Sequence, residues 1–214
     1  MLKVETFINQ LMGSNCYMVW DDASKRSIVI DPASEKSLKE IDFITNNNLT
    51  LDYIFLTHEH TDHTWGVNAL IDAFPDAKVI CSKKCREALS QSSKAYFQLY
   101  FDDPSYEFYV KQVDLTTEDV GWHIDWDGYS VNFIETPGHS VGSVCIVIDN
   151  SLFGGDTLMP FKPFIKKRTG GSMEEYRQSI NRLLKRCPLS TIVYPGHGES
   201  MKMAEMLKFY DIVL

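Results

Sequence analysis

The sequence predicts an α/β fold in which two mixed β-sheets pack face to face and helices cover both outer surfaces, a four-layer αβ/βα sandwich. Three observations indicate this fold. Strand-like apolar runs recur along the chain, the first of them follow one another directly, and later ones alternate with helical patterns in an order that partly repeats. Because no linker rich in Pro, Gly or Ser divides the 214 residues, we expect one domain over residues 1–214.

Eight runs are expected to form strands, because many are rich in Val, Ile and aromatic residues and are bounded by Gly, Pro, Asn or Asp. They are Val4–Ile8, Cys16–Trp20, Ser27–Ile30, Tyr53–Leu56, Lys78–Cys81, Val131–Ile134, Val144–Ile148 and Thr191–Tyr194. A further short strand is expected at Ser151–Phe153. Several of these strands end directly before a loop that contains histidine or aspartate.

Helices are expected where apolar residues recur at helical spacing. Within residues 34–46, Leu38, Ile41 and Ile44 fall on one stripe. Ser172 and Glu175 form a capping-box pair ahead of apolar residues at helical spacing, so a helix is expected to start there. Further helices are expected over residues 65–74 and from about residue 201 to 210.

Residues 82–127 are the least regular stretch, and we interpret them as a variable lid or insert region. Their segment 96–109 is aromatic, with Tyr96, Phe97, Tyr100 and Phe101 spaced to line one face of a helix. Such a face covers an active site, packs in a core or contacts another subunit. The sequence leaves these three roles open.

Composition narrows the class of protein. The formal net charge of −8, from 29 acidic and 21 basic residues, disfavours nucleic acid as a partner. No apolar run reaches the ~18 residues of a membrane span, and residues 1–16 lack the apolar stretch of a secretory signal. The five cysteines are scattered and odd in number, which favours reduced thiols. We therefore expect a cytoplasmic protein that does not bind membranes.

Five of the six histidines lie in three short blocks, of which the first is His58-Glu59-His60-Thr61-Asp62-His63. This block lies between an apolar run and an expected helix, which places it on a loop at the carboxyl edge of a sheet. His58 and His60 can point the same way, whereas Asp62 and His63 approach from another angle. Imidazole and carboxylate at this density indicate metal ligands, and one such loop can serve two ions about 3.5–4 Å apart.

Three later loops offer further ligands. His139 follows Pro137-Gly138, Asp156 follows Gly154-Gly155, and His197 lies in Pro195-Gly196-His197-Gly198. Each comes directly after an expected strand, and the neighbouring glycines allow the backbone to approach closely. The sixth histidine, His123, lies between aromatic residues without such a loop, so we expect no site role for it.

This ordered set resembles the metallo-β-lactamase-fold hydrolase superfamily, and especially its glyoxalase II (hydroxyacylglutathione hydrolase) branch, over about residues 14–199. The resemblance implies the metallo-β-lactamase fold, a dinuclear metal site and a metal-dependent hydrolase. By this likeness, His58, His60 and His139 hold one zinc ion and Asp62, His63 and His197 hold the other. Asp156 bridges the two, and iron or manganese remain possible in place of zinc because the same ligands suit them.

Two more residues are candidates for supporting the ligands. Asp31 follows the strand Ser27–Ile30 and resembles the buried supporting aspartate of the family, and Thr57 offers its hydroxyl. Ligating imidazoles usually donate their second N–H to such groups. Ordinary turn chemistry at a strand end is an equally good interpretation of both residues.

The chemistry implied by the resemblance is hydrolysis by a hydroxide bound to both metals, which attacks a thioester or another activated acyl compound. Asp156 and Asp62 are the catalytic candidates, the first fixing the ion spacing and the second accepting a proton. No serine or cysteine nucleophile is expected. Asp156→Ala is expected to lose metal and turnover together.

The expected substrate is a small molecule, with a glutathione or other thiol conjugate as one possibility. Glyoxalase II binds glutathione partly through a carboxyl-terminal helical extension, which we expect to be missing because the chain ends about 17 residues after His197. Lys166, Lys167 and Arg168 could bind a substrate carboxylate or phosphate instead. A charge run is more often solvated surface, and a homo-oligomer is left open.

An alternative from another enzyme class is a non-haem iron persulfide dioxygenase of the same superfamily, in which two histidines and a carboxylate hold one iron. Flavodiiron proteins differ by a glutamate at the position of His60, nucleases fit the acidic composition poorly, and β-lactamases are typically exported. A metal-binding scaffold without turnover is a further alternative.

Overall fold

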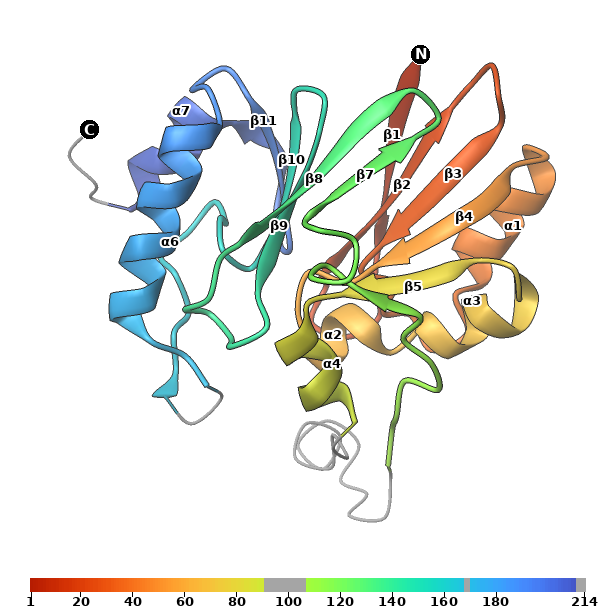
Figure 1. Ribbon diagram of the computed structural model, residues 1–214, viewed down its shortest axis with the longest axis horizontal. Helices are drawn as coiled ribbons and strands as arrows, with labels where there is room; N and C mark the ends of the chain where they lie inside the picture. The colour runs from red at the N-terminus through yellow and green to blue at the C-terminus, as the bar shows by residue number, and fades with distance from the viewer. Residues whose placement is uncertain (91–106, 168–169, 211–214) are drawn as a thin grey trace.

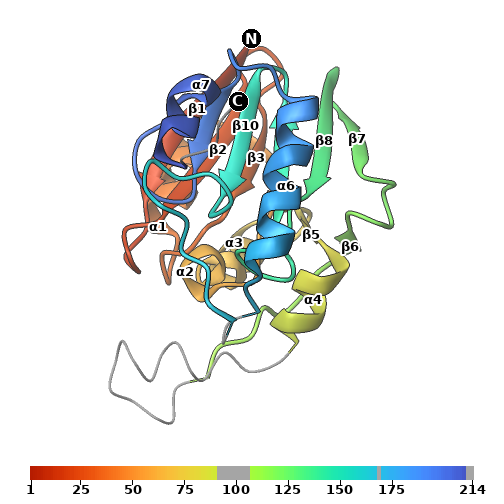
Figure 2. The same ribbon diagram turned by 90° about the vertical axis from the view of Figure 1, so that its left-hand side faces the viewer.

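The structure is a computed structural model, and it describes residues 1–90, 107–167 and 170–210. Within these ranges the strands form two six-stranded sheets, of order β1-β2-β3-β4-β5-β6 and β12-β11-β10-β9-β8-β7. Figure 1 shows α1 and α3 outside the first sheet and α6 and α7 outside the second. In Figure 2, α6 lies in front of the second sheet and the first sheet lies behind it. This is the four-layer αβ/βα sandwich that the sequence predicts.

The amino-terminal half of the chain builds the first sheet. Its strands β1 to β3 are antiparallel and β3 to β6 are parallel. The strands are β1 (Leu2–Ile8), β2 (Asn15–Asp21), β3 (Arg26–Ile30), β4 (Thr50–Phe55), β5 (Lys78–Cys81) and β6 (Leu115–Thr116). The helices that accompany them are α1 (Leu38–Asn46), α2 (Thr61–Thr64), α3 (Val67–Ala73) and α4 (Lys83–Leu89).

The second sheet is antiparallel except where β10 and β11 run parallel. Its strands are β7 (His123–Trp126), β8 (Tyr129–Glu135), β9 (Val144–Ile148), β10 (Ser151–Gly155), β11 (Ile192–Pro195) and β12 (Met201–Lys202). The helices described beside it are α6 (Met173–Arg186), α7 (Met203–Met206) and the 3₁₀ helix η2 (Leu207–Phe209). None of the helices in the described ranges combines the length and the apolar character that crossing a bilayer requires.

The alternation of side chains along the strands fills three apolar layers. In β3, Ile28 and Ile30 point into the layer between the sheets, where they join Phe55 and Phe153. Val29 points the other way, into the layer beneath the helices of the first sheet. A third layer joins the second sheet to α6 and α7. Because both faces of such strands are buried, they are apolar along almost their whole length.

The expected elements are found with shifted ends, and three of them differ for local reasons. The helix over residues 34–46 begins at Leu38, because Ser37 adopts a left-handed conformation and its hydroxyl donates to Ser34 and Gly66 carbonyls. The helix over 65–74 starts only at Val67, and the short α2 precedes it. The helix expected from about residue 201 begins only at Met203, because Met201 and Lys202 pair with β11.

The stretch 82–127 contains more regular structure than its sequence indicates. It contributes α4, β6 and β7, which the sequence analysis does not predict. Strand β6 contains only two residues and β7 carries polar residues at alternate positions, so neither has a strong apolar pattern. The aromatic residues 96–101 lie outside the described ranges, and the lid interpretation stays a prediction.

Loops at one edge of the two sheets carry the candidate site residues. Asp31 follows β3 and the first histidine block follows β4, both in the first sheet. His139, Asp156 and His197 follow β8, β10 and β11 of the second sheet. The site therefore forms where the two sheets meet, and neither sheet supplies it alone.

Candidate metal centre

The residues expected to hold a first metal converge. His58 and His60 come from the loop after β4, and His139 comes from the loop after β8. One side-chain nitrogen of each lies within 4.8 Å of the others. His60 Nδ1 and His139 Nε2 face each other at 2.9 Å. Such a cluster of imidazole nitrogens can hold a divalent transition metal.

The residues expected to hold a second metal form a group with the same spacing. Asp62, His63 and His197 place one ligand atom each within 4.8 Å of one another. His197 Nε2 lies 3.3 Å from Asp62 Oδ2, and His63 Nε2 lies 3.7 Å from the same oxygen. Two nitrogens and a carboxylate oxygen suit zinc, iron and manganese alike.

Asp156 lies between the two groups, with one carboxylate oxygen toward each. Its Oδ2 is 3.3 Å from His139 Nε2 of the first group. Its Oδ1 is 3.4 Å from His63 Nε2 and 3.7 Å from His197 Nε2 of the second group. This is the arrangement that a bridging carboxylate requires.

Hydrogen bonds determine which nitrogen of each ring is free. Thr57 donates its hydroxyl to Asp31 Oδ2 at 2.6 Å, so it is free to accept the N–H of His58 Nδ1 at 3.0 Å. His63 Nδ1 donates to Asp31 Oδ2 at 3.0 Å, and His139 Nδ1 donates to the Phe164 carbonyl at 2.9 Å. In all three rings Nε2 is left with its lone pair toward the centre.

These contacts favour the supporting role of Asp31 and Thr57 over ordinary turn chemistry. Asp31, His58 and His63 also form a compact group of their own. Asp31 faces the Nδ1 side of His63, and its other oxygen accepts the Thr57 N–H at 2.8 Å. Asp31 therefore orients the His63 ring directly and the His58 ring through the Thr57 hydroxyl.

Three buried atoms at the centre have no hydrogen-bond partner among the described residues. They are His58 Nε2, His63 Nε2 and Asp156 Oδ1. A buried polar atom without a partner costs about 1–3 kcal/mol. The three atoms belong to both groups and to the carboxylate between them. The donor set therefore fits a cation that would satisfy all three atoms at once.

Protonation at the site also suits metal binding. Burial lowers the pKa of His58 and of His139 below the usual value of imidazole. Burial and the neighbouring His139 ring lower the pKa of His60 to about 4. These three rings are therefore neutral near pH 7 and able to donate a lone pair.

The carboxylates attract positive charge. Burial by itself raises the pKa of Asp156, but His63 and other imidazoles outweigh it and hold this pKa well below its usual range. Asp62 follows the same balance, with His63 and His197 holding its pKa down. Burial opposes a charged His63, yet Asp156 and Asp62 raise its pKa well above the usual value. A proton on His63 or a bound metal cation can balance the negative charge of these two carboxylates.

Two glycines allow the loops to approach. A Cβ on Gly196 would lie 2.1 Å from Asp156 Oδ1 and 2.9 Å from His63 Cε1. Gly155 has a φ of +47°, and a Cβ there would lie 2.4 Å from the Thr57 hydroxyl. The Gly-Asp and Gly-His motifs are thus needed for space at the centre.

Residues that the sequence analysis does not single out also support the centre. Asn15 donates its side-chain N–H groups to the Pro195 and Gly198 carbonyls at 2.9 and 2.8 Å, which holds the His197 loop. Ser14 donates its hydroxyl to the Asp62 carbonyl. These contacts join segments about 50 or 180 positions apart, and no local sequence pattern signals them.

The remaining candidates lie outside the two groups. Lys166 and Lys167 are exposed on the loop after Asp156, and Lys166 Nζ lies 4.2 Å from the centre of the Phe164 ring. Arg168 lies outside the described residues. His123 is exposed on β7, where its Nε2 lies 3.0 Å from Asp125 Oδ1, and it belongs to neither group.

Residues 138–142 match the Gly-x-Ser-x-Gly pattern of serine hydrolases. The serine of this match, Ser140, donates its hydroxyl to Glu59 Oε2 at 2.9 Å, and its oxygen lies 2.8 Å from the Ser143 hydroxyl. A nucleophilic serine needs a base that takes its proton. Here the Ser140 hydroxyl donates to Glu59 instead of to a histidine. The histidine of the motif, His139, belongs to the first group.

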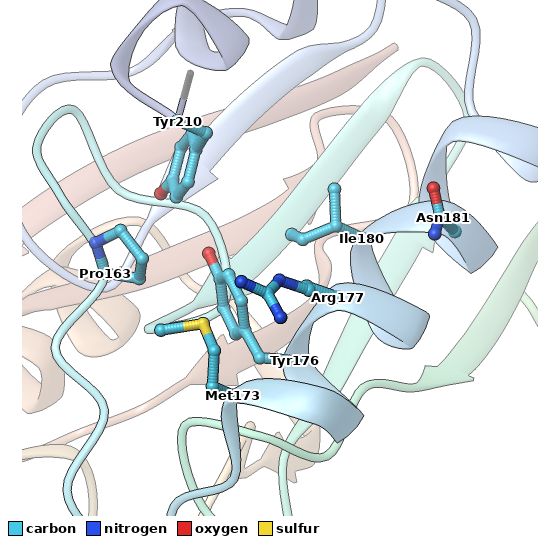
Figure 3. Close-up of a pocket in the computed structure, with 7 residues that line it drawn as sticks. All are labelled: Pro163, Met173, Tyr176, Arg177, Ile180, Asn181 and Tyr210. Atoms are coloured by element: carbon cyan, nitrogen blue, oxygen red, sulfur yellow. The ribbon is translucent and has the colours of Figure 1, made fainter. Parts of the chain in front are cut away.

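A separate cavity of about 490 Å³ lies along α6 (Figure 3). It is lined by Pro163, Met173, Tyr176, Arg177, Ile180, Asn181 and Tyr210. The Tyr176 hydroxyl donates to the Thr157 carbonyl at 2.7 Å, and the Tyr210 hydroxyl donates to the Met159 carbonyl at 2.8 Å. Its two tyrosines therefore hold the turn that follows Asp156.

Comparison with known proteins shows the family to which this chain belongs. The family model of the metallo-β-lactamase superfamily matches residues 10–197. The chain belongs to the metallo-β-lactamase superfamily. The match covers the whole set of candidate ligands, and the two packed sheets agree with the metallo-β-lactamase fold that the sequence analysis expects.

Curated relatives within the superfamily include named hydrolases. The chain is 29% identical to the probable polyketide biosynthesis zinc-dependent hydrolase BaeB of Bacillus velezensis, over 96% of this chain and 84% of that protein. It is 31% identical to hydroxyacylglutathione hydrolase 1 of Vibrio vulnificus, over 96% of this chain and 70% of that protein. These relatives support a metallo-hydrolase.

Solved structures share the fold. The BLEG-1 B3 metallo-β-lactamase superposes with a TM-score of 0.80 at 25% identity, over 97% of both chains. ETHE1 from Myxococcus xanthus (TM-score 0.72, 97% of this chain and 82% of that one) and TTHA1623 in a di-iron-bound form (0.78, 97% and 99%) are each 22% identical. At that identity they show the fold alone.

Proposed function

We propose that this protein is a metal-dependent hydrolase with a dinuclear zinc centre, and that it cleaves a thioester or another activated acyl compound. The observation that carries the proposal is the pair of ligand groups, His58, His60 and His139 against Asp62, His63 and His197, joined by Asp156. Seven side chains from two sheets, six of which form two compact groups of three while the seventh lies between them, favour two cations over one.

The residues of the chain would divide the work as follows. Bound zinc lowers the pKa of a water to near ~7 and polarises a carbonyl oxygen. Asp156 holds the two ligand groups at a fixed spacing, and Asp62 is placed to accept a proton from the attacking water. Asp31, Thr57 and the Phe164 carbonyl keep Nδ1 of His63, His58 and His139 protonated, so that Nε2 of these rings stays available.

The proposed substrate is a small thiol ester, with a glutathione conjugate as the first candidate. Similarity to a hydroxyacylglutathione hydrolase and to a polyketide zinc-dependent hydrolase supports this class. Lys166 and Lys167 are proposed to bind an anionic end of the substrate, because their loop also carries the carbonyl that orients His139. Arg168 belongs to the same proposal.

The proposal includes the setting of the enzyme. We propose a single domain over residues 1–214 and a cytoplasmic location, since all five cysteines are free thiols. No nucleic acid is proposed as a partner, because the net charge is −8.

A metal analysis combined with a substrate panel tests the proposal. The panel contains S-lactoylglutathione, a simple thioester, a lactone and a phosphodiester. We expect about two zinc ions per chain and hydrolysis of a thioester. Asp156→Ala should lower both metal content and turnover, the latter by at least about 100-fold, and His60→Ala should do the same.

His123→Ala is the matched control, because it removes a histidine that lies outside the centre. It should keep full metal content and activity. One iron per chain, with oxygen consumed on glutathione persulfide, would instead identify the dioxygenase alternative. A protein that binds metal but turns over none of the panel would be a scaffold. An Asp156→Ala variant with full metal and full activity refutes the bridging role.

A further inference from the structure

Glu59 lies inside the first histidine block but belongs to neither ligand group. Its carboxylate points to the loop that carries His139. There it accepts a hydrogen bond from the Ser140 hydroxyl at 2.9 Å, and its Oε2 packs against Gly142. Both residues follow His139 in the chain, so this carboxylate joins the two loops of the first group.

The surroundings of Glu59 are closely packed. A Cβ on Gly142 would lie 2.5 Å from Glu59 Oε2 and 2.7 Å from the Cys85 backbone. Ser82, the N-cap of α4, donates its hydroxyl to the Gly142 carbonyl at 2.7 Å. The loop after His139 is thus held on one side by Glu59 and on the other by α4.

The two ligand groups are held together by different contacts. In the second group, Asn15 and Ser14 hold the His197 loop and the Asp62 backbone. In the first group, the two loops come from different sheets. Besides the facing rings of His60 and His139, they are joined by the Val144 N–H on the Thr57 carbonyl at 2.8 Å. They are also joined by the Glu59 carboxylate, which is next in sequence to both His58 and His60.

We propose that Glu59 is a positioning residue that fixes the loop of His58 and His60 relative to the loop of His139, and so sets the metal affinity of the first group. This inference rests on the metal centre proposed above. Glu59 belongs to neither ligand group. It acts through the hydroxyl of Ser140, which is adjacent to His139 in the chain.

Metal titration of the demetallated protein tests this role. Zn²⁺ is added against a chromophoric chelator, which resolves two binding steps in the wild-type chain. Glu59→Ala should weaken one step by about 10–100-fold, the usual effect of removing a group that orients a ligand. The other step should stay within about 3-fold. Glu59→Gln keeps one acceptor oxygen and should restore most of the affinity.

Glu118→Ala is the matched control. Glu118 also accepts a hydroxyl, from Thr117 at 3.0 Å, as well as a backbone N–H, from Lys83 at 2.9 Å, but it contacts neither metal loop. This variant should titrate like the wild type. Where Glu59→Ala fails to fold, Ser140→Ala removes only the other partner of the hydrogen bond and should weaken the same step.

The outcomes separate this inference from the function it rests on. A wild-type chain that binds no metal overturns the proposed centre. A wild-type chain with two binding steps, and a Glu59→Ala variant with the same two steps unchanged, overturns the role of Glu59 alone. Equal weakening of both steps also overturns it, because the effect of Glu59 would then not be specific to the first group.

Discussion

At the scale of single residues, the centre depends on groups that accept the N–H of the ligand rings on the side that faces away from the centre. Asp31 is the clearest case, because one carboxylate accepts from the Thr57 N–H, the Thr57 hydroxyl and His63 Nδ1. Asp31 also has a φ of 55°, in the left-handed region. Aspartate and asparagine both tolerate that region, so its charge can be removed without straining the backbone.

Asp31→Asn is therefore expected to weaken metal binding without unfolding the chain. The amide keeps one acceptor oxygen, but its NH₂ group only donates, so at least one of the hydrogen bonds from Thr57 and His63 is lost. Metal affinity should fall by about 10–100-fold, measured by chelator competition. Asp52→Asn is the control, because Asp52 lies near the start of β4, whereas the ligand loop follows the end of that strand, and it accepts from Trp126 and Arg26 instead of from groups of the centre. Unchanged affinity in Asp31→Asn would show that Asp31 does not orient the rings.

The sequence predicts the seven candidate ligands because their chemistry is local: histidine or aspartate on a glycine-containing loop after a strand. The geometry brings all seven together. It also adds Phe164, whose carbonyl orients His139, and Asn15, which holds the His197 loop. A backbone carbonyl can belong to any type of residue, so the role of Phe164 has no sequence motif. Asn15 lies at the start of β2, and no motif around it indicates its contacts. These supports could not be read from the sequence.

At the scale of elements, α1 carries an unusual buried group. Glu40 is 1% exposed, and neither of its carboxyl oxygens has a well-formed hydrogen bond among the described residues. Burial raises its pKa above the usual value, and the Cys16 thiol faces it. The sequence analysis places Leu38, Ile41 and Ile44 on one stripe of this helix, but of these only Ile44 is fully buried and Leu38 is 60% exposed. It does not predict that a carboxyl group is buried on this helix.

The stability contribution of Glu40 should depend on pH. Below the unfolded pKa of about 4.3 both states are protonated. As the pH rises, the unfolded chain loses its proton first, because the folded pKa is higher, and folding becomes less favourable. Urea unfolding should therefore show Glu40→Gln gaining on the wild type between pH 4 and 7, by about 1.4 kcal/mol per unit of raised pKa.

Glu35→Gln, an exposed position just before α1, controls for the loss of one acidic charge. It should not gain on the wild type in this way. A constant difference between Glu40→Gln and the wild type across the pH range would contradict a raised pKa of Glu40 in the folded protein.

At the scale of the whole molecule, the centre lies where the two sheets meet. Each group takes ligands from both sheets, and Asp156 adds a contact between the groups. Because the unfolded chain does not present these ligands together, a bound metal stabilises the folded state.

Removal of metal should lower the thermal stability of the whole chain. At a free metal concentration about 100 times Kd, binding adds about 2.7 kcal/mol. For a domain of this size that corresponds to about 5–10 °C in Tm. Calorimetry with zinc and then with a chelator measures the difference. Asp156→Ala should show a smaller difference, His123→Ala should show the full one, and a Tm insensitive to chelation would contradict the proposed centre.

The fold class, most strands and the candidate ligands can be predicted from the amino-acid pattern, because apolar periodicity and ligand chemistry act over a few neighbouring residues. That pattern could not place β6 and β7, whose short or polar strands form by pairing with neighbours in the sheet. The packing of the two sheets shows which loops bring candidate ligand atoms within 4.8 Å of one another and which side chains contact the rings from the other side. Those properties depend on distances between segments far apart in the chain, which side-chain patterns along one segment do not encode.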